Sequence, residues 1–380
     1  MGKGIERREF LKVLGVTGAG TSLLAGCHPN GADKLIPYVV PHEDIVPGLA
    51  TWYHTTCREC PAGCGMSIRT REGRAVKAEG NPLSPISHGH LCARGQASLH
   101  GVYDPDRIPQ ALARSGTDWD KISWDDAEQR VYNAVAANRG RTAFLTHTFT
   151  GTLDRLIDDW CAAMGVERVR YDAFAWEAVR AGYASVFGGD AVPVHDFSTA
   201  DVVVTFGADF METWVSPIDY ANSWVRAHSY TEGRRGKLIS VTPHQSLTDM
   251  NSDEWLNIRP GTEHIAALAI ARIITEQHGG SAGPAGAVLG SPAVGADQAA
   301  QTCGVTADRL RSIARDFARN GRSLAVGPGV SSSHRAATAV AAAVAILNQV
   351  AGNIGKTVKV GQSEEFTRAG SYRGAQDLIG

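Results

Sequence analysis

The chain has 380 residues, of which 43% are hydrophobic and 20% are charged, and its formal net charge is −2. This length exceeds what one hydrophobic core usually holds, so we expect two or three domains. The 37 basic and 39 acidic residues nearly balance and form no basic stripe, which argues against a nucleic-acid partner.

Residues 1–27 have the pattern of an export signal and are set apart from the fold. Arg7-Arg8 and the residues after it are typical of a twin-arginine signal. The apolar run that follows is shorter than the roughly 20 residues that a membrane-spanning helix needs. It ends at Leu24-Ala25-Gly26-Cys27, which resembles the lipobox of bacterial lipoproteins. We expect export by the twin-arginine route, lipid on Cys27 and a place on the periplasmic face of the bacterial inner membrane. The alternative is a chance Arg-Arg pair before a hydrophobic helix.

Residues 28–50 contain four prolines and predict an extended tether.

Four cysteines dominate the next stretch: Cys57, Cys60, Cys64 and Cys92. Three lie within eight residues as C-x2-C-x3-C, and the fourth follows after a gap of 27 residues. Four converging thiolates are the usual ligands of a [4Fe–4S] cluster, and Gly63 permits the tight loop that this requires. A four-cysteine zinc site is an alternative, although zinc usually takes two C-x2-4-C knuckles. Disulfides are a further alternative in an exported chain.

Arginines are frequent around this motif, namely Arg58, Arg69, Arg71 and Arg94. Positive charge beside a cluster favours its reduced, more anionic state and raises its potential. For each arginine except Arg94, a solvated surface position is an equally good interpretation. Cys161 and Cys303 fit buried, small hydrophobic positions better than ligand positions.

The elements expected around the cysteines are a hairpin of two strands and a helix. Met66–Arg71 and Arg74–Glu79 alternate as strands joined at Glu72-Gly73, and Cys92 opens a helix through Tyr103. From about residue 120 strands and helices alternate, which predicts mostly parallel sheets covered by helices. We expect strands at 142–147, 168–171, 201–206, 237–241 and 323–326. We expect helices at 123–137, 152–164, 176–187, 217–228, 262–278, 306–319 and 334–350, and a surface loop or insertion at 279–295.

Ligands in such folds bind at the carboxyl ends of strands. Three loops qualify: Thr148–Thr152, Gly207–Thr213 and Gly327–Ser333. None has a glycine-rich phosphate signature, and each alone fits a simple connection as well as a binding loop.

Several short motifs occur in a familiar order: the cysteine spacing, Glu79-Gly80-Asn81-Pro82, Cys92-Ala-Arg94-Gly95, Asp104-Pro-Asp-Arg107, Ile258-Arg-Pro-Gly-Thr-Glu263 and Gly352-Asn-Ile-Gly-Lys356. Over residues 51–358 the chain resembles the molybdopterin oxidoreductases of the bis-guanine-dinucleotide class. The resemblance implies a small iron–sulfur domain followed by interleaved α/β domains. It also implies that Arg94 lies between cluster and pterin and helps to pass electrons. Asp253 and Glu263 match acidic family positions near the guanine of one cofactor half.

The departures from the family pattern concern molybdenum. The segment 171–180, where the family carries a Cys, selenocysteine, Ser or Asp ligand, offers only Asp172 and Glu177 as acidic candidates. The 207–213 loop carries Asp209 and Glu212, and two carboxylates beside a pyrophosphate are electrostatically unfavourable. These 380 residues also stop where the family still needs its C-terminal domain to cover the pterins, so either the chain is truncated or it never binds the full cofactor. We therefore expect a [4Fe–4S] cluster but no molybdopterin.

A chain with an export signal, a lipobox and no molybdenum ligand is similar to the N-terminal, molybdopterin-like half of the large iron–sulfur subunit of alternative complex III. This resemblance implies an electron-transfer or scaffold subunit of a membrane-attached, quinol-oxidising respiratory complex, without a catalytic site of its own. Its partners would be quinol-oxidising membrane subunits, a ferredoxin-like domain or subunit, and cytochrome c subunits. Two alternatives remain: a true molybdopterin-dependent reductase of the polysulfide or thiosulfate type, and a metal-free assembly module.

The expected division of the chain follows from these motifs. It comprises a signal at 1–27, a tether at 28–50, a cluster domain at 51–107, one α/β domain at 108–171 plus 276–358, an inserted α/β domain at 172–275, and a tail at 359–380.

Overall fold

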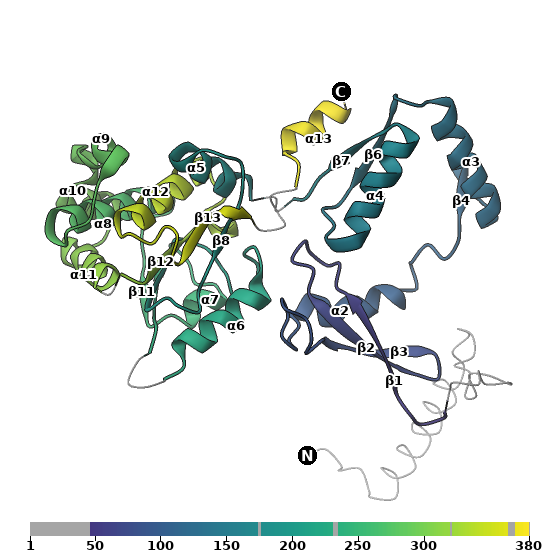
Figure 1. Ribbon diagram of the computed structural model, residues 1–380, viewed down its shortest axis with the longest axis horizontal. Coiled ribbons are helices and arrows are strands. Elements are labelled where there is room, and N and C mark those ends of the chain that lie inside the picture. The colour runs from purple at the N-terminus through teal and green to yellow at the C-terminus, as the bar shows by residue number, and fades with distance from the viewer. Residues whose placement is uncertain (1–45, 174–175, 231–234, 320, 364–368, 380) are drawn as a thin grey trace, which may run out of the picture. The chain divides into compact units, whose positions relative to one another are not determined.

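Figure 1 shows the computed structural model of the chain. The structure describes residues 46–173, 176–230, 235–319, 321–363 and 369–379. The expected signal, the lipidation site at Cys27 and most of the tether lie outside the described residues. Among the helices that are described, none combines the length and the apolar character needed to cross a membrane.

The cysteine region is a three-stranded sheet with one helix. Strands β1 (Thr51–Thr56), β2 (Gly65–Arg71) and β3 (Arg74–Gly80) follow one another in the sheet, and α2 spans Ala93–Val102. The predicted hairpin is confirmed: Glu72 and Gly73 form its turn with φ angles of 45° and 76°. The predicted helix is confirmed as well, with Cys92 as its N-cap.

Residues 112–170 form a small group of elements. They comprise β4 (Leu112–Ser115), β5 (Asp118–Lys121), α3 (Trp124–Ala137), β6 (Thr142–Thr146), α4 (Gly151–Met164) and β7 (Val166–Arg170). Ser123 caps α3 by accepting a hydrogen bond from the backbone N–H of Asp126, as its sequence predicts. Strands β6 and β7 pair in parallel. Parallel sheets are normally covered on both faces, yet Phe144 and Leu145, on opposite faces of β6, are 40% and 50% exposed.

The larger α/β part has a four-stranded sheet in the order β11-β10-β9-β12, and all its strand pairs are parallel. Its strands are β9 (Val202–Thr205), β10 (Lys237–Val241), β11 (Glu254–Leu256) and β12 (Ser323–Val326). Its helices are α5 (Glu177–Phe187), α6 (Pro217–His228), α7 (Leu247–Met250), α8 (Glu263–Gln277), α9 (Gly286–Leu289), α10 (Ala296–Cys303), α11 (Ala307–Ala318) and α12 (Ala337–Val350). A two-stranded antiparallel sheet joins β8 (Pro193–His195) to β13 (Val358–Ser363).

Successive residues of the central strands enter two different cores, as the period of a strand requires. In β9, Val202 and Val204 pack in one core with residues of α8, α11 and α12. Val203 packs in the other core with aromatic residues that include Trp214 and Trp224 of the α6 region. Burial on both faces therefore explains the three consecutive valines of this strand.

The structure draws the domain boundary elsewhere than expected. Strand β12 pairs with β9, so residues 276–358 share a sheet and cores with 172–275 rather than with 108–171. The interleaved arrangement was inferred from family order, because strand periodicity cannot specify which strand is the neighbour.

Two other segments differ from their expected state. Residues 279–295 contain two 3-10 turns and α9. Leu289 packs in the core with residues of α8, and Val294 is buried as well, so this segment is not simply a surface loop. The expected tail contains β13 and a further helix, α13 (Tyr372–Ile379). The backbone N–H of Gly370 donates to the carbonyl of Arg170 at 3.1 Å, which attaches this segment to the end of β7.

A buried asparagine completes the outer edge of β12. Asn348, on α12, accepts a hydrogen bond from the N–H of Ala325 at 2.9 Å and donates one to the carbonyl of the same residue at 2.8 Å. Asn353 donates to the Asn348 side chain at 3.1 Å. The Asn348 amide thus satisfies backbone groups that a fifth strand would otherwise pair.

A second buried polar group lies close by. The Nε2 atom of His195 is 3.4 Å from the hydroxyl of Tyr183, whose oxygen is 3.5 Å from Asn348 Nδ2. Burial lowers the pKa of His195 to about 3, so the imidazole is neutral in the folded protein.

Candidate metal centre

The first three cysteines lie on a closed loop between β1 and β2. The N–H of Cys57 donates to the carbonyl of Cys64 at 2.8 Å, which joins the two ends of the loop. Gly63 has a φ of +62°, and a Cβ atom there would lie 2.6 Å from the Thr150 hydroxyl. Glycine is therefore required both by the backbone conformation and by the close approach of a neighbouring loop.

The fourth cysteine is brought to this loop by residues 80–92. A Cβ on Gly80 would lie within 2.4 Å of the Gly89 and His90 backbone, so the segment folds tightly on itself. The hydroxyl of Ser87 donates to the carbonyl of Gly65 at 2.8 Å and ties the segment to the start of β2. Cys92 then begins α2.

All four thiols are within electrostatic reach of one another. Burial, followed by the charges of Cys60, Cys57 and Cys92, raises the pKa of Cys64 to about 12. Burial also raises the thiol pKa of Cys57 and of Cys60, although backbone N–H groups of Glu59 and Ala62, respectively, oppose it. Four crowded thiols of this kind become thiolates when a cationic group binds among them, and the N–H donors then stabilise the sulfur charge.

The state of the cysteines bears on whether they hold a single metal ion or an iron–sulfur cluster. All six cysteines in the described ranges are free, including Cys161 and Cys303, which are buried as predicted. No three or more His, Cys, Asp or Glu side chains in the described part of the chain are arranged to hold a single metal ion. A mononuclear zinc site needs sulfurs about 2.3 Å from one centre, whereas a four-iron cluster is larger and separates its ligands more widely. Four thiols with backbone N–H donors beside them are the donor set that a [4Fe–4S] cluster takes.

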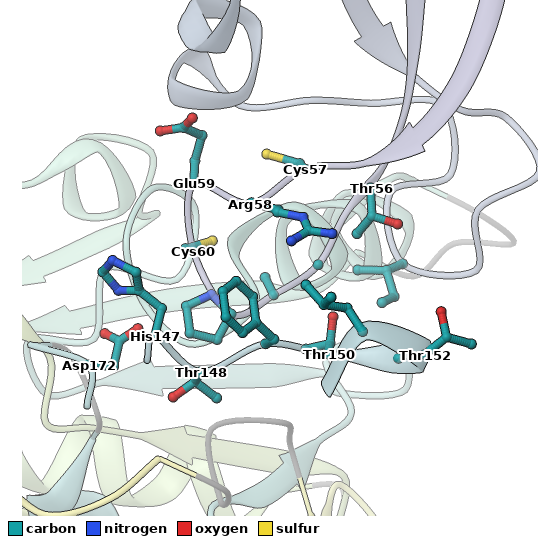
Figure 2. Close-up of a pocket in the computed structure, with 17 residues that line it drawn as sticks. Thr56, Cys57, Arg58, Glu59, Cys60, His147, Thr148, Thr150, Thr152 and Asp172 are labelled. Carbon is teal, nitrogen blue, oxygen red and sulfur yellow. The ribbon is translucent and has the colours of Figure 1, made fainter. Parts of the chain in front are cut away.

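A cavity of about 750 Å³ adjoins the cysteine loop (Figure 2). One wall is the Cys57–Gly63 loop, and the other is the loop from β6 to α4 with Asp172. The Arg58 guanidinium lies 5.4 Å from the centre of the Phe149 ring. Figure 2 shows the His147 imidazole and the Asp172 carboxylate on the side of Cys60, and the Thr150 hydroxyl directed toward Arg58. The sequence singled out 148–152 as a loop at the end of a strand, but it gave no signal that this loop meets the cysteines.

Arg94 lies where the sequence places it, beside the cysteines. It lines a cavity of about 240 Å³ together with Cys60 and Asp172, and another of about 210 Å³ together with Cys92 and Glu212. Its charge counteracts the rise in the pKa of Cys60 that burial causes. Its assigned role in passing electrons to a pterin stays a prediction.

The two acidic candidates of segment 171–180 are separated by the fold. Asp172 lines the cavities beside Cys60. Glu177 instead accepts a hydrogen bond from the backbone N–H of Tyr372 at 2.6 Å. This hydrogen bond connects Glu177 to the first residue of α13.

The two residues matched to guanine contacts, Asp253 and Glu263, have different partners in the structure. Asp253 accepts a hydrogen bond from the N–H of Leu238 at 2.9 Å and contacts Arg235 at 3.2 Å, at the amino ends of β10 and β11. Glu263 is fully buried at the start of α8, and one of its oxygens is 3.1 Å from His334 Nε2. Its other oxygen has no hydrogen-bond partner in the described part of the chain. The structure thus brings the cysteines and Arg94 together, while the roles expected for Asp253 and Glu263 near a guanine stay predictions.

The other two predicted loops pack on each other at the carboxyl ends of β9 and β12. Ser331 donates to the Gly207 carbonyl at 2.9 Å, and Ser332 donates to the Phe206 carbonyl at 3.0 Å. Asp209 in the first loop accepts a hydrogen bond of 2.5 Å from the Thr248 hydroxyl. The charge of Asp209 raises the pKa of Glu212, and Arg94 opposes this rise. This edge of the sheet therefore carries its own paired and acidic groups, which is an unfavourable surface for a pyrophosphate.

Comparison with known proteins agrees with the cysteine site. Residues 50–104 match the family model of the molybdopterin oxidoreductase Fe4S4 domain. The chain is 26% identical over 363 residues to the menaquinone reductase, molybdopterin-binding-like subunit, of Nitratidesulfovibrio vulgaris, covering 93% of this chain and 52% of that protein. It is 28% identical to the molybdopterin-containing subunit of the arsenate respiratory reductase of Shewanella sp., covering 70% of this chain and 32% of that protein. It is 27% identical to the molybdopterin-containing subunit of the thiosulfate reductase of Salmonella typhimurium, covering 72% and 35%.

A solved structure supports the fold. Acetylene hydratase from Pelobacter acetylenicus superposes with a TM-score of 0.61 at 15% identity, covering 81% of this chain and 44% of that one. The chain spans about half, or less, of the length of the relatives it matches. Residues 50–104 thus match the molybdopterin oxidoreductase Fe4S4 domain, and most of the chain is similar to subunits of molybdopterin oxidoreductases.

Proposed function

We propose that the chain is an electron-transfer and scaffold subunit of a membrane-attached, quinol-oxidising respiratory complex similar to alternative complex III, and that it works without molybdenum. The observation that carries the proposal is the convergence of four free cysteines in the Fe4S4 domain. A [4Fe–4S] cluster held by Cys57, Cys60, Cys64 and Cys92 would supply one-electron oxidation and reduction. The chain's own residues bury the thiols, donate N–H groups to them and place Arg94 beside them.

The absence of molybdenum is supported by what lines the adjoining cavities. Asp172 is the acidic residue of segment 171–180 that lies there, and no sulfur accompanies it from this segment. Glu177 is engaged by the backbone of Tyr372. At the carboxyl end of β9, Asp209 and Glu212 disfavour the pyrophosphate of a dinucleotide cofactor.

The membrane setting rests on the N-terminal sequence and on one relative. Arg7-Arg8 and Cys27 would direct export and lipid attachment to the periplasmic face of the inner membrane. A relative that matches 93% of this chain is a menaquinone reductase subunit described as molybdopterin-binding-like. We propose quinol-oxidising membrane subunits, a ferredoxin-like domain or subunit, and cytochrome c subunits as partners.

A second candidate is a molybdopterin-dependent reductase of the polysulfide or thiosulfate type. It is favoured by the cavity of about 750 Å³ directly beside the cysteines, with His147 and Asp172 in its wall. The metal-free assembly module held by disulfides is less favoured, because the described cysteines are free.

Metal analysis of the natively exported protein separates these functions. We expect about four iron atoms per chain, as a [4Fe–4S] cluster requires, and no stoichiometric molybdenum. Iron together with molybdenum would make the chain a catalytic subunit and return Asp172 to consideration as a ligand. Absence of both metals from protein kept anaerobic throughout would refute electron transfer and leave the assembly role.

A further inference from the structure

The guanidinium of Arg58 has an aromatic partner rather than an acidic one. Its Cζ atom lies 5.4 Å from the centre of the Phe149 ring, within the range of a cation–π interaction. No ion pair joins Arg58 to a carboxylate in the part of the chain that the structure describes. Within the described ranges, the contact recorded for its charge is therefore with an aromatic ring.

This charge is carried by the cysteine loop itself. Arg58 follows Cys57 directly, and Arg58, Cys57 and Cys60 line the same cavity. Figure 2 shows the Arg58 side chain extending from the cysteine loop beside Cys57. Because a cluster gains negative charge on reduction, a nearby cation stabilises its reduced state.

The aromatic ring comes from a different loop, and the two loops are in close contact. Phe149 is half-buried between β6 and α4. Its neighbour Thr150 approaches Gly63 so closely that a Cβ there would meet the Thr150 hydroxyl at 2.6 Å. The approach of Thr150 to Gly63 keeps the ring beside the arginine, although Arg58 itself is exposed to solvent.

We propose that Phe149 is a positioning residue that holds the Arg58 guanidinium beside the cysteine loop, and that the charge so placed raises the reduction potential of the bound cluster. The inference rests on the proposed function in that a cluster must occupy the four cysteines. The inference goes beyond the proposed function, because it assigns part of the control of the reduction potential to a residue of the β6–α4 loop. Without the ring, an exposed arginine samples many rotamers and its average charge moves into the solvent.

The test is a redox titration of the anaerobically prepared full chain, followed by the electron paramagnetic resonance signal of the reduced cluster. Phe149→Leu should lower the reduced-to-oxidised ratio at the wild-type midpoint about threefold, which is about 28 mV for a one-electron couple. Phe149→Trp should keep the wild-type potential, because Trp presents the best cation–π face. Phe144→Leu, which alters a partly exposed phenylalanine on β6, serves as the matched control and should cause no shift.

A double-mutant cycle assigns the effect to the pair. Arg58→Gln should lower the potential by itself, and adding Phe149→Leu to it should cause no further change. The shifts should shrink at high ionic strength because Arg58 is exposed. An unchanged potential in Phe149→Leu, or a shift that persists in the Arg58→Gln background, would overturn the proposal. Wild-type protein without iron would overturn the proposed function as well. Iron analysis before the titration identifies that outcome.

Discussion

Replacement of Asn348 tests the inference that a side-chain amide completes the edge of the central sheet. Leucine is close to asparagine in size and removes both hydrogen-bonding groups. In Asn348→Leu the N–H and the carbonyl of Ala325 both lose their buried partner, where the wild-type distances are 2.9 and 2.8 Å. Each buried group left unpaired costs about 1–3 kcal/mol. Two such groups cost about 2–6 kcal/mol. Burial of the added apolar surface returns about 1 kcal/mol, so we expect a net loss of about 1–5 kcal/mol.

The assay is urea unfolding followed by tryptophan fluorescence, which reports on the buried Trp214 and Trp224 in the same part of the chain. Gln349→Leu, at the next and half-buried position of α12, is the matched control and should change stability by less than about 0.5 kcal/mol. An Asn348→Leu variant within about 0.5 kcal/mol of wild type would refute the reasoning. It would mean that the Ala325 groups do not depend on the amide.

Three further predictions concern the cysteines, the core and pH. Cys57→Ser should lower the amount of bound iron and loosen its loop, because ligand binding contributes to folding. Cys161→Ser is the control and should leave the iron content unchanged. Equal iron content in the two variants would contradict the assignment of Cys57 as a ligand. Gly182→Ala should lower the free energy of unfolding by about 1–2 kcal/mol, because its Cβ would lie 2.3 Å from the Ala341 Cβ, and Ala341→Gly in the same protein should restore part of it. His195 has a folded pKa of about 3, so the unfolded chain takes up its proton as pH falls through about 6.5, and stability should drop by about 2 kcal/mol between pH 7 and pH 5. Urea unfolding at pH 7 and pH 5 should show that His195→Leu loses about 2 kcal/mol less stability over this interval than the wild type does. An equal loss in the two proteins would count against a neutral buried imidazole.

Much of the local structure could be predicted because it depends on short-range chemistry. The expected helix at Pro217–His228 and the expected strand at Lys237–Val241 coincide with α6 and β10. Ser123 and Gly73 are where the structure needs a cap and a left-handed turn. The short strands β8 and β11 were missed because three residues give too little periodicity to detect.

The site could be predicted only in part. Cysteine spacing named the four thiols, because a cluster constrains ligands that are close in sequence. The meeting of Arg58 with Phe149 depends on the packing of two loops that are about 90 residues apart in the chain, and composition does not encode such a contact. The pairing of β12 with β9 is equally a matter of tertiary packing, which is why the expected domain division differed from the one observed.

Several large apolar side chains of β6 and α3 are exposed to solvent. Leu145 on β6 is 50% exposed, and Trp124 and Tyr132 on α3 are 65% and 59% exposed. A strand with uncovered apolar side chains is a template on which other molecules can add. We therefore expect reversible self-association of the purified chain that grows with concentration. Leu145→Lys should reduce this self-association and leave the iron content unchanged. Self-association and cluster binding would then depend on different residues.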